Sequence, residues 1–431
     1  MCLRTSLLTP MPAKTLEAWL EHLEHAHSKP IDLSLERAAE VAARMHLRPA
    51  GKILTVAGTN GKGSTVATAN ALLRAQGVQV GVFTSPHILS FNERIVINDT
   101  CASDEAIVDA FEAIERARGD ISLTYYEFSA LAAATIFERA KVDVWILEVG
   151  LGGRLDAVNI FDADVAVVTS IDLDHQDYLG GTRELIAIEK AGVARAGAPC
   201  VVAESNLPQT LLPQLRRIGA ECVCVNAQYE LTVEQAHWSG TWQSSEGHVS
   251  LGGVPLSALL PSNLGAGVQS VLSLGYGLPR NASTLLTDLQ VPGRREVRVV
   301  QNRTVLIDVA HNPAAIHALN EYIQTRFAEK TCRAVFSAMI DKDTGTMFAL
   351  AADTISHWYL PNQSQNPRVA RALDLKNVLV GTMGAIASCY DTVAQACEAM
   401  WQESQQDDLL LIIGSFTTVA AFEVWADETE N

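Results

Sequence analysis

The chain has 431 residues, more than one ordinary hydrophobic core holds, so its length predicts two or three domains. A composition of 48% hydrophobic and 19% charged residues is typical of a soluble globular protein. The formal net charge of −17, without a basic stripe, argues against a nucleic-acid partner. No run reaches the roughly 18 apolar residues that a membrane span needs.

The cellular compartment is predicted from the N-terminus and the cysteines. The first residues have neither the apolar core nor the cleavage site of a signal peptide. The eight cysteines are scattered without paired metal-ligand spacing, which indicates reduced thiols. We therefore expect a cytoplasmic protein with no membrane partner, and we expect it to be a monomer.

Residues 1–50 predict helices, because apolar residues recur there at helical spacing. From residue 52 onward, strand-like and helix-like runs alternate, which predicts a mostly parallel sheet with helices on both faces. The predicted strands are 53–57, 78–83, 142–149, 165–170, 199–204 and 222–225, and the predicted helices are 62–76, 104–116, 128–140 and 183–194. Residues 228–258 predict a small antiparallel or loop-rich insert, and a short helix follows at 261–276.

Segment 52–64, Lys-Ile-Leu-Thr-Val-Ala-Gly-Thr-Asn-Gly-Lys-Gly-Ser, predicts a buried strand that turns into a helix. The N–H groups of such a glycine-rich turn, the helix N-terminus and the Lys62 ammonium together form a cradle for phosphate. The standard phosphate-loop spacing is broken by Gly63, so Ser64 or Thr65 must supply the hydroxyl. The alternative is a purely structural strand-to-helix turn.

Pro292, Gly293 and Arg294 predict a hinge, after which a second α/β unit begins. Its predicted strands are 304–309, 333–336, 357–360 and 408–414, and its predicted helices are 313–327 and 392–403. The predicted fold class is α/β. A parallel-sheet, ATPase-like P-loop domain occupies 1–292, and a smaller Rossmann-like domain occupies 293–431.

Polar residues stand where predicted strands end, which is where open α/β sheets bind their ligands. Ser85 and His175 follow two strands, Glu148 ends a third, and Lys190 lies in a nearby helix. A hydroxyl, a carboxylate and an imidazole near phosphate oxygens suit Mg²⁺. The plainer alternatives are a turn residue at Ser85 and a structural salt bridge at Glu148. For His175 the alternative is an ordinary hydrogen-bonded histidine, and for Lys190 a solvated lysine.

The second unit offers fewer candidate residues. Asp308 and His311 lie between a predicted strand and a helix that begins at Pro313. They either cap that helix or reach a nucleotide across the cleft. Arg294 at the hinge either touches phosphate or is a plain surface arginine.

Taken in order, these segments resemble the Mur ligase superfamily, and within it the bacterial folylpolyglutamate synthase family in its bifunctional dihydrofolate synthase form. One motif alone would be weak, whereas the ordered set is specific and covers nearly the whole chain. The matching segments are Gly-Thr-Asn-Gly-Lys-Gly-Ser at 58–64, Thr-Ser-Pro-His at 84–87, Glu-Val-Gly-Leu-Gly-Gly-Arg-Leu-Asp at 148–156, Asp-His at 174–175, Glu-Lys-Ala-Gly at 189–192, Pro-Gly-Arg at 292–294, Asp-Val-Ala-His-Asn-Pro at 308–313 and Gly-Ser-Phe at 414–416.

The resemblance implies an ATP site and a metal site. The ATP residues that it implies are Thr59, Asn60, Gly61, Lys62, Gly63, Ser64, Thr65, Asn263, Arg294, Asp308 and His311. The residues that it implies for Mg²⁺ are Ser85, Glu148 and His175, with Lys190 as a CO₂-derived carbamate that binds a second ion. The expected catalytic residues are Lys62, His175 and Lys190. Asn263 departs from the family pattern, because Leu-Gly-Ala follows it where relatives have an alanine-rich helix start.

Segment 121–128, Ile-Ser-Leu-Thr-Tyr-Tyr-Glu-Phe, is similar to the stretch with which the bifunctional enzymes hold dihydropteroate. Its aromatic rings offer flat surfaces for a pterin, and Glu127 can accept a hydrogen bond from the pterin amino group. The substrate residues expected on this basis are Thr124, Tyr125, Tyr126, Glu127, Arg154 and Asp156. The alternative is that the aromatic residues belong to the core in front of a helix.

The implied function is an ATP-dependent amide ligase that adds L-glutamate to dihydropteroate and to reduced folates. ATP would phosphorylate the substrate carboxylate, and the glutamate amine would then displace phosphate from the acyl phosphate. Two alternatives stay open. One is a Mur-type ligase acting on a peptidoglycan precursor, and the other is a non-catalytic nucleotide-binding regulator.

Overall fold

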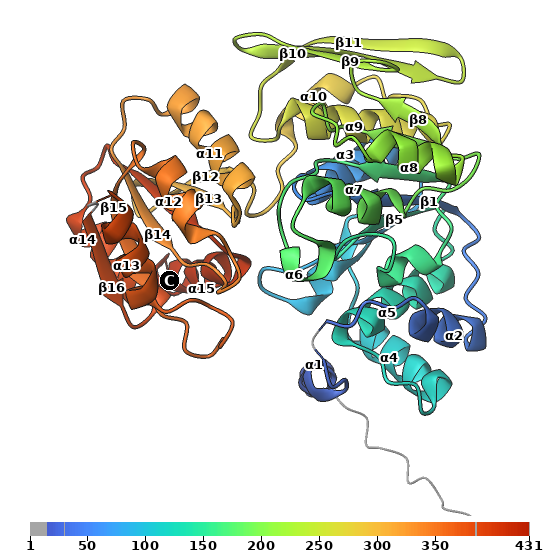
Figure 1. Cartoon of the computed structure of the whole chain (residues 1–431), viewed down its shortest axis with the longest axis horizontal. Coiled ribbons are helices and arrows are strands. Elements are labelled where there is room, and N and C mark those ends of the chain that lie inside the picture. The colour runs from blue at the N-terminus through green and yellow to red at the C-terminus, as the bar shows by residue number, and fades with distance from the viewer. Residues whose placement is uncertain (1–14, 30, 384–385, 431) are drawn as a thin grey trace, which may run out of the picture.

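The structure, a computed structural model, describes residues 15–29, 31–383 and 386–430. Two α/β bodies lie side by side (Figure 1). The larger contains an eight-stranded sheet and a three-stranded sheet, and the smaller contains a six-stranded sheet. Residues 1–14 of the predicted helical N-terminus lie outside the described residues.

The eight-stranded sheet is the frame of the larger body. Its strands are β1 Lys52–Ala57, β2 Val80–Phe83, β3 Ile95–Ile97, β4 Thr100–Cys101, β5 Val144–Glu148, β6 Val165–Val168, β7 Pro199–Val202 and β8 Glu221–Cys224. They are ordered β4-β3-β2-β5-β1-β6-β7-β8. All pair in parallel except the β3–β4 hairpin, which extends one edge antiparallel. The inner strands are buried on both faces, which explains their continuous hydrophobic sequences.

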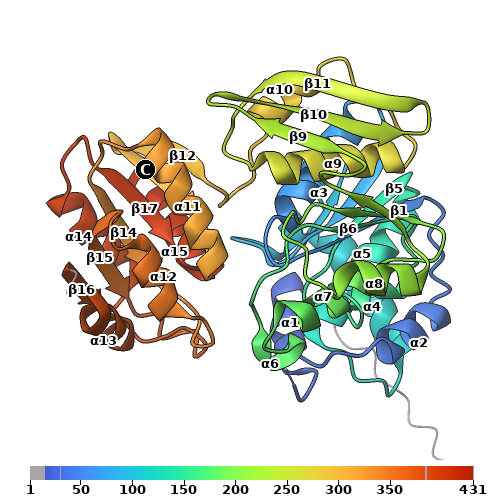
Figure 2. The same cartoon turned by 45° about the horizontal axis from the view of Figure 1, so that its top comes forward.

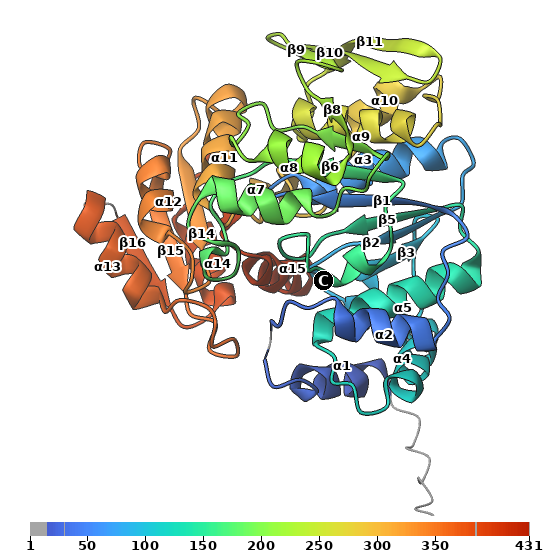
Figure 3. The same ribbon diagram turned by 45° about the vertical axis from the view of Figure 1, so that its right-hand side comes forward.

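Helices cover both faces of this sheet and form a separate core on each face. One core contains α1 Leu16–His25, α2 Glu36–Arg44, α4 Asp104–Arg118, α5 Tyr125–Ala140, α7 Arg183–Ala191 and α8 Leu211–Ile218. Figure 3 shows α1, α2, α4 and α5 together on one side of the sheet. The other core contains α3 Lys62–Arg74, α9 Pro261–Ser273 and α10 Ala282–Asp288. The short helices η1 Phe91–Arg94, η2 Ala157–Ile160 and α6 Gln176–Leu179 lie in connecting loops.

The insert is a three-stranded antiparallel sheet that lies over α9 (Figure 2). Its strands are β9 Glu230–Val233, β10 His237–Ser244 and β11 Gly247–Pro255. Trp238 and Trp242 alternate with more exposed neighbours on β10, and both rings are buried. The Trp242 indole Nε1–H donates to the Gly265 carbonyl oxygen at 2.9 Å. This pairing confirms the antiparallel alternative for residues 228–258.

The smaller body is a second, mostly parallel sheet. Its strands are β12 Glu296–Val300, β13 Arg303–Asp308, β14 Cys332–Phe336, β15 Ile355–Pro361, β16 Ile386–Tyr390 and β17 Leu409–Ile413, in the order β12-β13-β17-β14-β15-β16. Only β12 pairs antiparallel. One face carries α11 Pro313–Arg326, α12 Thr344–Ala351 and α13 Ala372–Met383. The opposite face carries α14 Val393–Glu403 and α15 Phe416–Glu430.

These elements confirm the predicted α/β class and both parallel sheets, with shifts of a few residues at element ends. The sequence patterns predicted no element for β3, β4, β12, β16, α6, α8, α10, α12, α13 or α15, nor for the short helices η1 and η2. The edge strands β3 and β4 have only 3 and 2 residues, too few to show an alternating pattern. Within the described ranges, no helix is long and apolar enough to cross a membrane.

Candidate active site

A cleft of about 930 Å³ lies between the two bodies, at the carboxyl ends of their parallel strands. The larger body lines it with the segments after β1, β2, β5 and β6, and the smaller body with those after β13, β14 and β17. The sequence-predicted residues that line the cleft are Thr59, Asn60, Gly61, Lys62, Gly63, Ser64, Ser85, Glu148, His175, Lys190, Asn263, Arg294, Asp308 and His311. The fold thus brings together nearly all of the predicted nucleotide and metal residues.

The turn after β1 leads into α3 through a conformation that only glycine fits. Gly61 has φ +87°, in the left-handed region. A Cβ there would also lie 2.2 Å from the Asn263 side-chain oxygen. Lys62 Nζ donates to the carbonyl oxygens of Gly58 and Thr59 at 3.0 and 3.2 Å. A lysine and the N-terminus of a 13-residue helix therefore stand together on the cleft wall, the arrangement that binds phosphate.

Glu148 is a buried carboxylate without a cation partner. It is 4% exposed and forms no ion pair with any residue that the structure describes. Its Oε2 accepts from the Ser85 backbone N–H at 3.2 Å. Burial raises the pKa of Glu148, although the charges of Lys62 and Arg294 act in the opposite direction. The salt-bridge alternative for Glu148 is therefore wrong.

This donor set fits a hard cation. A buried carboxylate is costly unless a cation balances it, and Ser85 and His175 line the same cleft as Glu148. Mg²⁺ prefers oxygen ligands and accepts an incomplete protein shell. Among residues 15–29, 31–383 and 386–430, no group of three or more His, Cys, Asp or Glu could hold a metal alone. Phosphate oxygens would have to complete the coordination.

Lys190 is also buried without a partner. It extends from α7 to the cleft wall, is 3% exposed, and makes no hydrogen bond or ion pair with the described part of the chain. Burial lowers the pKa of Lys190 to about 7, and the charge of Lys62 contributes in the same direction. The neutral amine of Lys190 is therefore formed at a lower pH than that of an exposed lysine. The solvated-lysine alternative is wrong, because this side chain is not on the surface.

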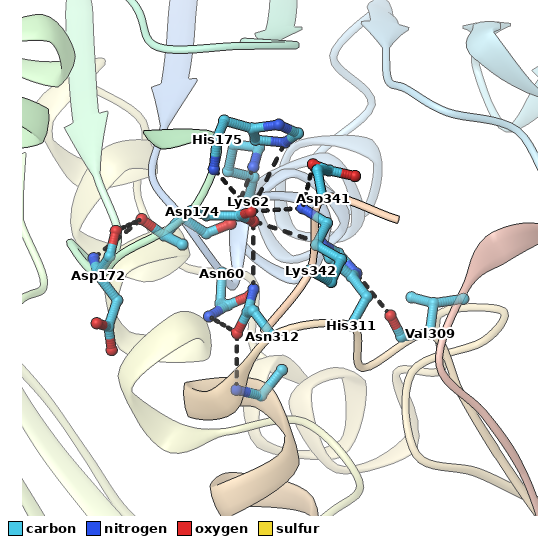
Figure 4. Close-up of polar contacts among 12 residues, drawn as sticks. Asn60, Lys62, Asp172, Asp174, His175, Val309, His311, Asn312, Asp341 and Lys342 are labelled. Atoms are coloured by element: carbon cyan, nitrogen blue, oxygen red, sulfur yellow. Dashed lines mark hydrogen bonds and ion pairs between the residues drawn. The ribbon is translucent and has the colours of Figure 1, made fainter. Parts of the chain in front are cut away.

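Asp174 connects the two bodies (Figure 4). From the smaller body, Lys342 Nζ donates to its Oδ1 at 2.5 Å, Asn312 Nδ2 donates to its Oδ2 at 3.4 Å, and His311 Nε2 lies 3.6 Å from that Oδ2. The His175 backbone N–H donates to Oδ1 at 2.9 Å. Burial alone would raise the pKa of Asp174, but the hydrogen bond and charges around it hold that pKa well below its usual range.

A reciprocal amide pair adds a second connection between the bodies. Asn60 Nδ2 donates to Asn312 Oδ1 at 3.1 Å, and Asn312 Nδ2 donates to Asn60 Oδ1 at 2.9 Å. Asn312 is 2% exposed and also caps α11, because its Oδ1 accepts from the Ala315 N–H. The glycine-rich turn of one body is thus tied to a helix start in the other.

Asp308 and His311 do not cap α11, because Asn312 takes that role. The Asp308 carboxylate instead accepts from the backbone N–H groups of Arg295 at 2.9 Å and Ala310 at 2.7 Å, so it holds the hinge against the turn after β13. His311 Nδ1 lies 2.8 Å from the Val309 carbonyl oxygen. A carbonyl only accepts, so Nδ1 carries the proton. The capping alternative is therefore wrong for both residues.

Arg294 is held on the cleft wall. Its guanidinium lies 5.1 Å from the centre of the Phe416 ring, in cation–π range. Burial lowers the pKa of Arg294, whereas Asp308 and Glu148 raise it. The surface-arginine alternative therefore does not fit this position.

Seven predicted residues lie outside the cleft wall: Thr65, Thr124, Tyr125, Tyr126, Glu127, Arg154 and Asp156. Thr65 Oγ1 donates to the Asn263 carbonyl oxygen at 3.3 Å and thereby joins α3 to α9. Arg154 pairs with Glu189 at 2.8 Å on the surface. The structure gives both residues packing roles and brings neither to the cleft.

Thr124 and Glu127 form a capping box at the start of α5. Thr124 Oγ1 accepts from the Glu127 N–H at 3.2 Å, and Glu127 Oε2 accepts from the Thr124 N–H at 2.7 Å. The other carboxylate oxygen of Glu127 faces Arg37 at 3.2 Å. With 3% exposure, Glu127 has no free acceptor for a pterin. Helix α5 starts at Tyr125 rather than at residue 128 because of this box.

Tyr126 and Asp156 belong to a second internal network of hydrogen bonds. The Tyr126 hydroxyl donates to Asp156 Oδ1 at 3.0 Å, while the N–H groups of Gly150 and Leu151 donate to Asp156 Oδ2, each at 2.9 Å. The Val158 N–H also reaches Oδ1 at 3.1 Å. Burial raises the pKa of Asp156 to about 6, although these hydrogen bonds act to lower that pKa. The contacts of Tyr126 and Asp156 fit the core alternative.

Two contacting residues were given no role by the sequence analysis, although they connect the bodies. Asn312 lies inside the motif 308–313, and an Asn directly before Pro at a helix start is a recognisable cap. Lys342 follows β14 in a stretch without any recognised motif. Its partner Asp174 is 168 residues away in the sequence, so no local pattern could have identified the pair.

Two family models match the chain. The Mur ligase middle domain matches residues 56–203, and the glutamate ligase domain of Mur ligases matches residues 293–416. The chain is 39% identical over 414 residues to the dihydrofolate synthase/folylpolyglutamate synthase of Escherichia coli (strain K12), covering 96% of each chain. It is 36% identical over 432 residues to the Haemophilus influenzae protein of the same name, covering 95% of this chain and 97% of that one.

Solved structures are similar over both bodies. Escherichia coli FolC in complex with DHPP and ADP superposes with a TM-score of 0.92 at 38% identity, covering 98% of this chain and 100% of that chain. A bifunctional folylpolyglutamate synthase/dihydrofolate synthase with Mn, AMPPNP and L-glutamate bound superposes with a TM-score of 0.88 at 39% identity and the same coverage. These similarities confirm the resemblance found in the sequence.

Proposed function

The chain belongs to the Mur ligase family, in its dihydrofolate synthase/folylpolyglutamate synthase branch, and we propose that it is an ATP-dependent ligase that joins L-glutamate to dihydropteroate and to reduced folates. The observation that carries the proposal is Glu148, a buried carboxylate without an ion pair on the same cleft wall as the glycine-rich turn. Such a group costs stability until a cation binds.

The nucleotide phosphates would bind at the turn before α3. There, Lys62 would exchange its two carbonyl partners for phosphate oxygens. The residues proposed to hold ATP remain Thr59, Asn60, Gly61, Lys62, Gly63, Ser64, Thr65, Asn263, Arg294, Asp308 and His311. Thr65 and Asn60 would contribute through positioning, because their side chains already hold other parts of the protein.

Ser85, Glu148 and His175 would hold Mg²⁺, which when bound neutralises phosphate charge. Lys190 is proposed to carry a carbamate. Its neutral amine would attack CO₂, forming an N–C bond and releasing one proton, and the buried cation would become an anion able to hold a second ion. Lys190→Ala is expected to lose ligation and to regain part of it with added short carboxylates. Full activity of this variant without rescue would exclude the carbamate.

The chemistry needs positioning and charge neutralisation. An oxygen of the acceptor carboxylate attacks the γ-phosphorus, the bond to ADP breaks, and an acyl phosphate results. The glutamate nitrogen then attacks the acyl carbon, the bond to phosphate breaks, and the amide remains. Lys62 and Arg294 stand where they can balance the charge of these steps. The two bodies enclose the cleft, which limits hydrolysis of the acyl phosphate by water.

The proposed acceptor site lies at the start of α5. Of the six predicted substrate residues, only Tyr125 keeps a partly exposed ring with no hydrogen bond that fixes it. We propose Tyr125 as a surface for the flat acceptor, and Thr124, Tyr126, Glu127, Arg154 and Asp156 as its structural support. We further propose the division into 1–292 and 293–431, a monomeric state and a cytoplasmic location. The free thiols of the described cysteines support that location.

The test is a product assay. The purified chain is incubated with Mg-ATP and L-glutamate, with dihydropteroate in one sample and tetrahydrofolate in another, and ADP release and product mass are followed. A mass gain of one glutamate residue in both samples is expected. A gain with tetrahydrofolate alone would exclude the dihydrofolate synthase activity and keep the folylpolyglutamate synthase activity. No gain in either sample, with ATP still bound, would favour another Mur-type acceptor or a regulator.

A further inference from the structure

The loop between β2 and β3 holds one polar, titratable cleft residue that neither the nucleotide site nor the metal site uses. This residue, His87, lines the cleft two positions after Ser85. The loop is closed tightly, because the Glu93 carboxylate accepts from the backbone N–H groups of Ile88 and Ser90, each at 2.7 Å, and of Leu89 at 2.8 Å. A loop fixed by three such bonds presents His87 in one place.

Arg94 fixes the orientation of the His87 ring. Its Nε–H donates to His87 Nδ1 at 2.9 Å. The guanidinium is itself held between two rings, 5.6 Å from the centre of Phe91 and 5.4 Å from that of Tyr125. Arg94 is buried and does not line the cleft, so it contacts His87 from the protein side.

This bond determines the tautomer of His87. An arginine Nε always carries its proton, so Nδ1 must be the acceptor and the imidazole must be neutral. Its one proton therefore sits on Nε2. No described residue accepts from Nε2, and it is not among the buried polar atoms that lack a partner, so this N–H is open to the cleft. The loop thus presents a neutral hydrogen-bond donor to the cleft that Ser85 and Glu148 also line.

We infer that His87 is a catalytic hydrogen-bond donor to the reacting carboxyl oxygen of the acceptor, and that Arg94 is its positioning residue. The inference rests on the ligase function proposed above. When the glutamate nitrogen attacks the acyl phosphate, a C–N bond forms, the carbonyl electron pair moves onto oxygen, and the nitrogen loses one proton to the departing phosphate. That oxygen needs a donor until the C–O bond to phosphate breaks. His87 keeps its proton throughout and acts as a donor, not as an acid.

Two substitutions of His87 separate the loss of its N–H donor from a change in the shape of its side chain. His87→Gln retains an N–H donor and is expected to keep kcat within about tenfold, whereas His87→Phe retains a ring without a donor and is expected to lose about 10²-fold in kcat. The KM for ATP stays near its original value in both. Arg94→Met leaves His87 in place with its tautomer free, and an intermediate loss is expected. The matched control is His317→Phe, an exposed histidine on α11 that leaves kcat unchanged.

Two measurements decide the inference. Nitrogen NMR of the full chain is expected to show His87 protonated at Nε2 only, and a mixture of tautomers in Arg94→Met; this needs no turnover and holds even if the proposed substrates are wrong. Positional isotope exchange in ATP with acceptor but without glutamate reports acyl-phosphate formation, and it is expected to change little in His87→Phe. A proton on Nδ1 in the original chain, or an unchanged kcat in His87→Phe, would overturn the inference.

Discussion

The cleft and the start of α5 contain the same kinds of side chain but use them in opposite ways. In the cleft, Glu148 and Lys190 are buried without an ion pair to any described residue. At the start of α5, Glu127 is equally buried, but it closes a capping box and faces Arg37. The residue types are alike, and the family resemblance predicted ligand roles for both regions.

The difference lies in what balances each buried charge. An unpaired buried group raises the free energy of the folded protein, whereas a paired one holds neighbouring elements together. Removing an unpaired charge should therefore cost activity and spare stability. Removing a paired charge should do the reverse.

Lys62→Ala should have the largest effect, on activity alone. We expect ATP-dependent ligation to fall by about 10⁴-fold, roughly 5.5 kcal/mol of lost transition-state stabilisation. The folded chain loses only two hydrogen bonds from Nζ to turn carbonyls, so its melting temperature should change little. Single-turnover rates and thermal unfolding measure the two quantities. Near-normal turnover would mean that Lys62 does not bind the ATP phosphates.

Lys190→Met should stabilise the chain, and the gain should depend on pH. The pKa of Lys190 is about 7 in the folded chain, against roughly 10.4 when unfolded. Between these values the unfolded chain binds more protons, so the stability of the original chain rises with pH across this window. The Met variant should therefore be more stable by about 4 kcal/mol below pH 7, and the gain should disappear near pH 10. Denaturant unfolding at a series of pH values, without metal and bicarbonate, measures this difference in unfolding free energy.

The control is Lys141→Met, because Lys141 is exposed and its side chain forms no hydrogen bond or ion pair with the described residues. It should show no such pH dependence. A Lys190→Met variant that is less stable than the original chain at pH 6 would mean that the lysine has a partner after all. The contrast between cleft and helix start would then fail on its clearest example.

Glu127→Ala should show the opposite behaviour. It removes the cap on the Thr124 N–H and one of the two carboxylate partners of Arg37, and we expect a loss of about 3 kcal/mol in unfolding free energy. Glu127→Gln keeps the cap but not the charge, so it should lose less. ATP affinity should not change in either variant. Unchanged stability together with lost dihydropteroate binding would restore Glu127 as a ligand.

The sequence could predict the sheets and the cleft, because both follow from local patterns. Continuous apolar runs predict buried strands, and polar residues after those runs predict ligands at the carboxyl ends. It could also have identified the true role of Glu127, because Thr124 and Glu127 have the spacing of a capping box before an apolar helix. The family resemblance and the aromatic rings predicted a substrate site instead, whereas the structure shows Glu127 in the capping box.

The contacts between the bodies could not be predicted in this way. Asn60 and Asn312 are separated by 252 residues, and each is an ordinary polar residue in its own segment. Only the docking of two complete sheets brings them together. The same applies to Asp174 and Lys342. The contacts that hold the two bodies together at the cleft are therefore harder to predict from the sequence than the residues that line the cleft.

Lys342→Met should have the smallest effect. It tests whether the Asp174–Lys342 pair holds the two bodies together at the cleft. Asp174 would lose its closest cation but keep His311 and Asn312, so we expect a loss of only about 1–2 kcal/mol. Because the pair joins the two bodies, the loss should appear as faster hydrogen exchange at residues 58–61 and in the first turn of α11, with little change in the core of either sheet. Uniform loss of protection across both sheets would mean that the bodies unfold as one unit. Asp174 would then stabilise the whole fold, and the two bodies could not separate as units that open and close around a substrate.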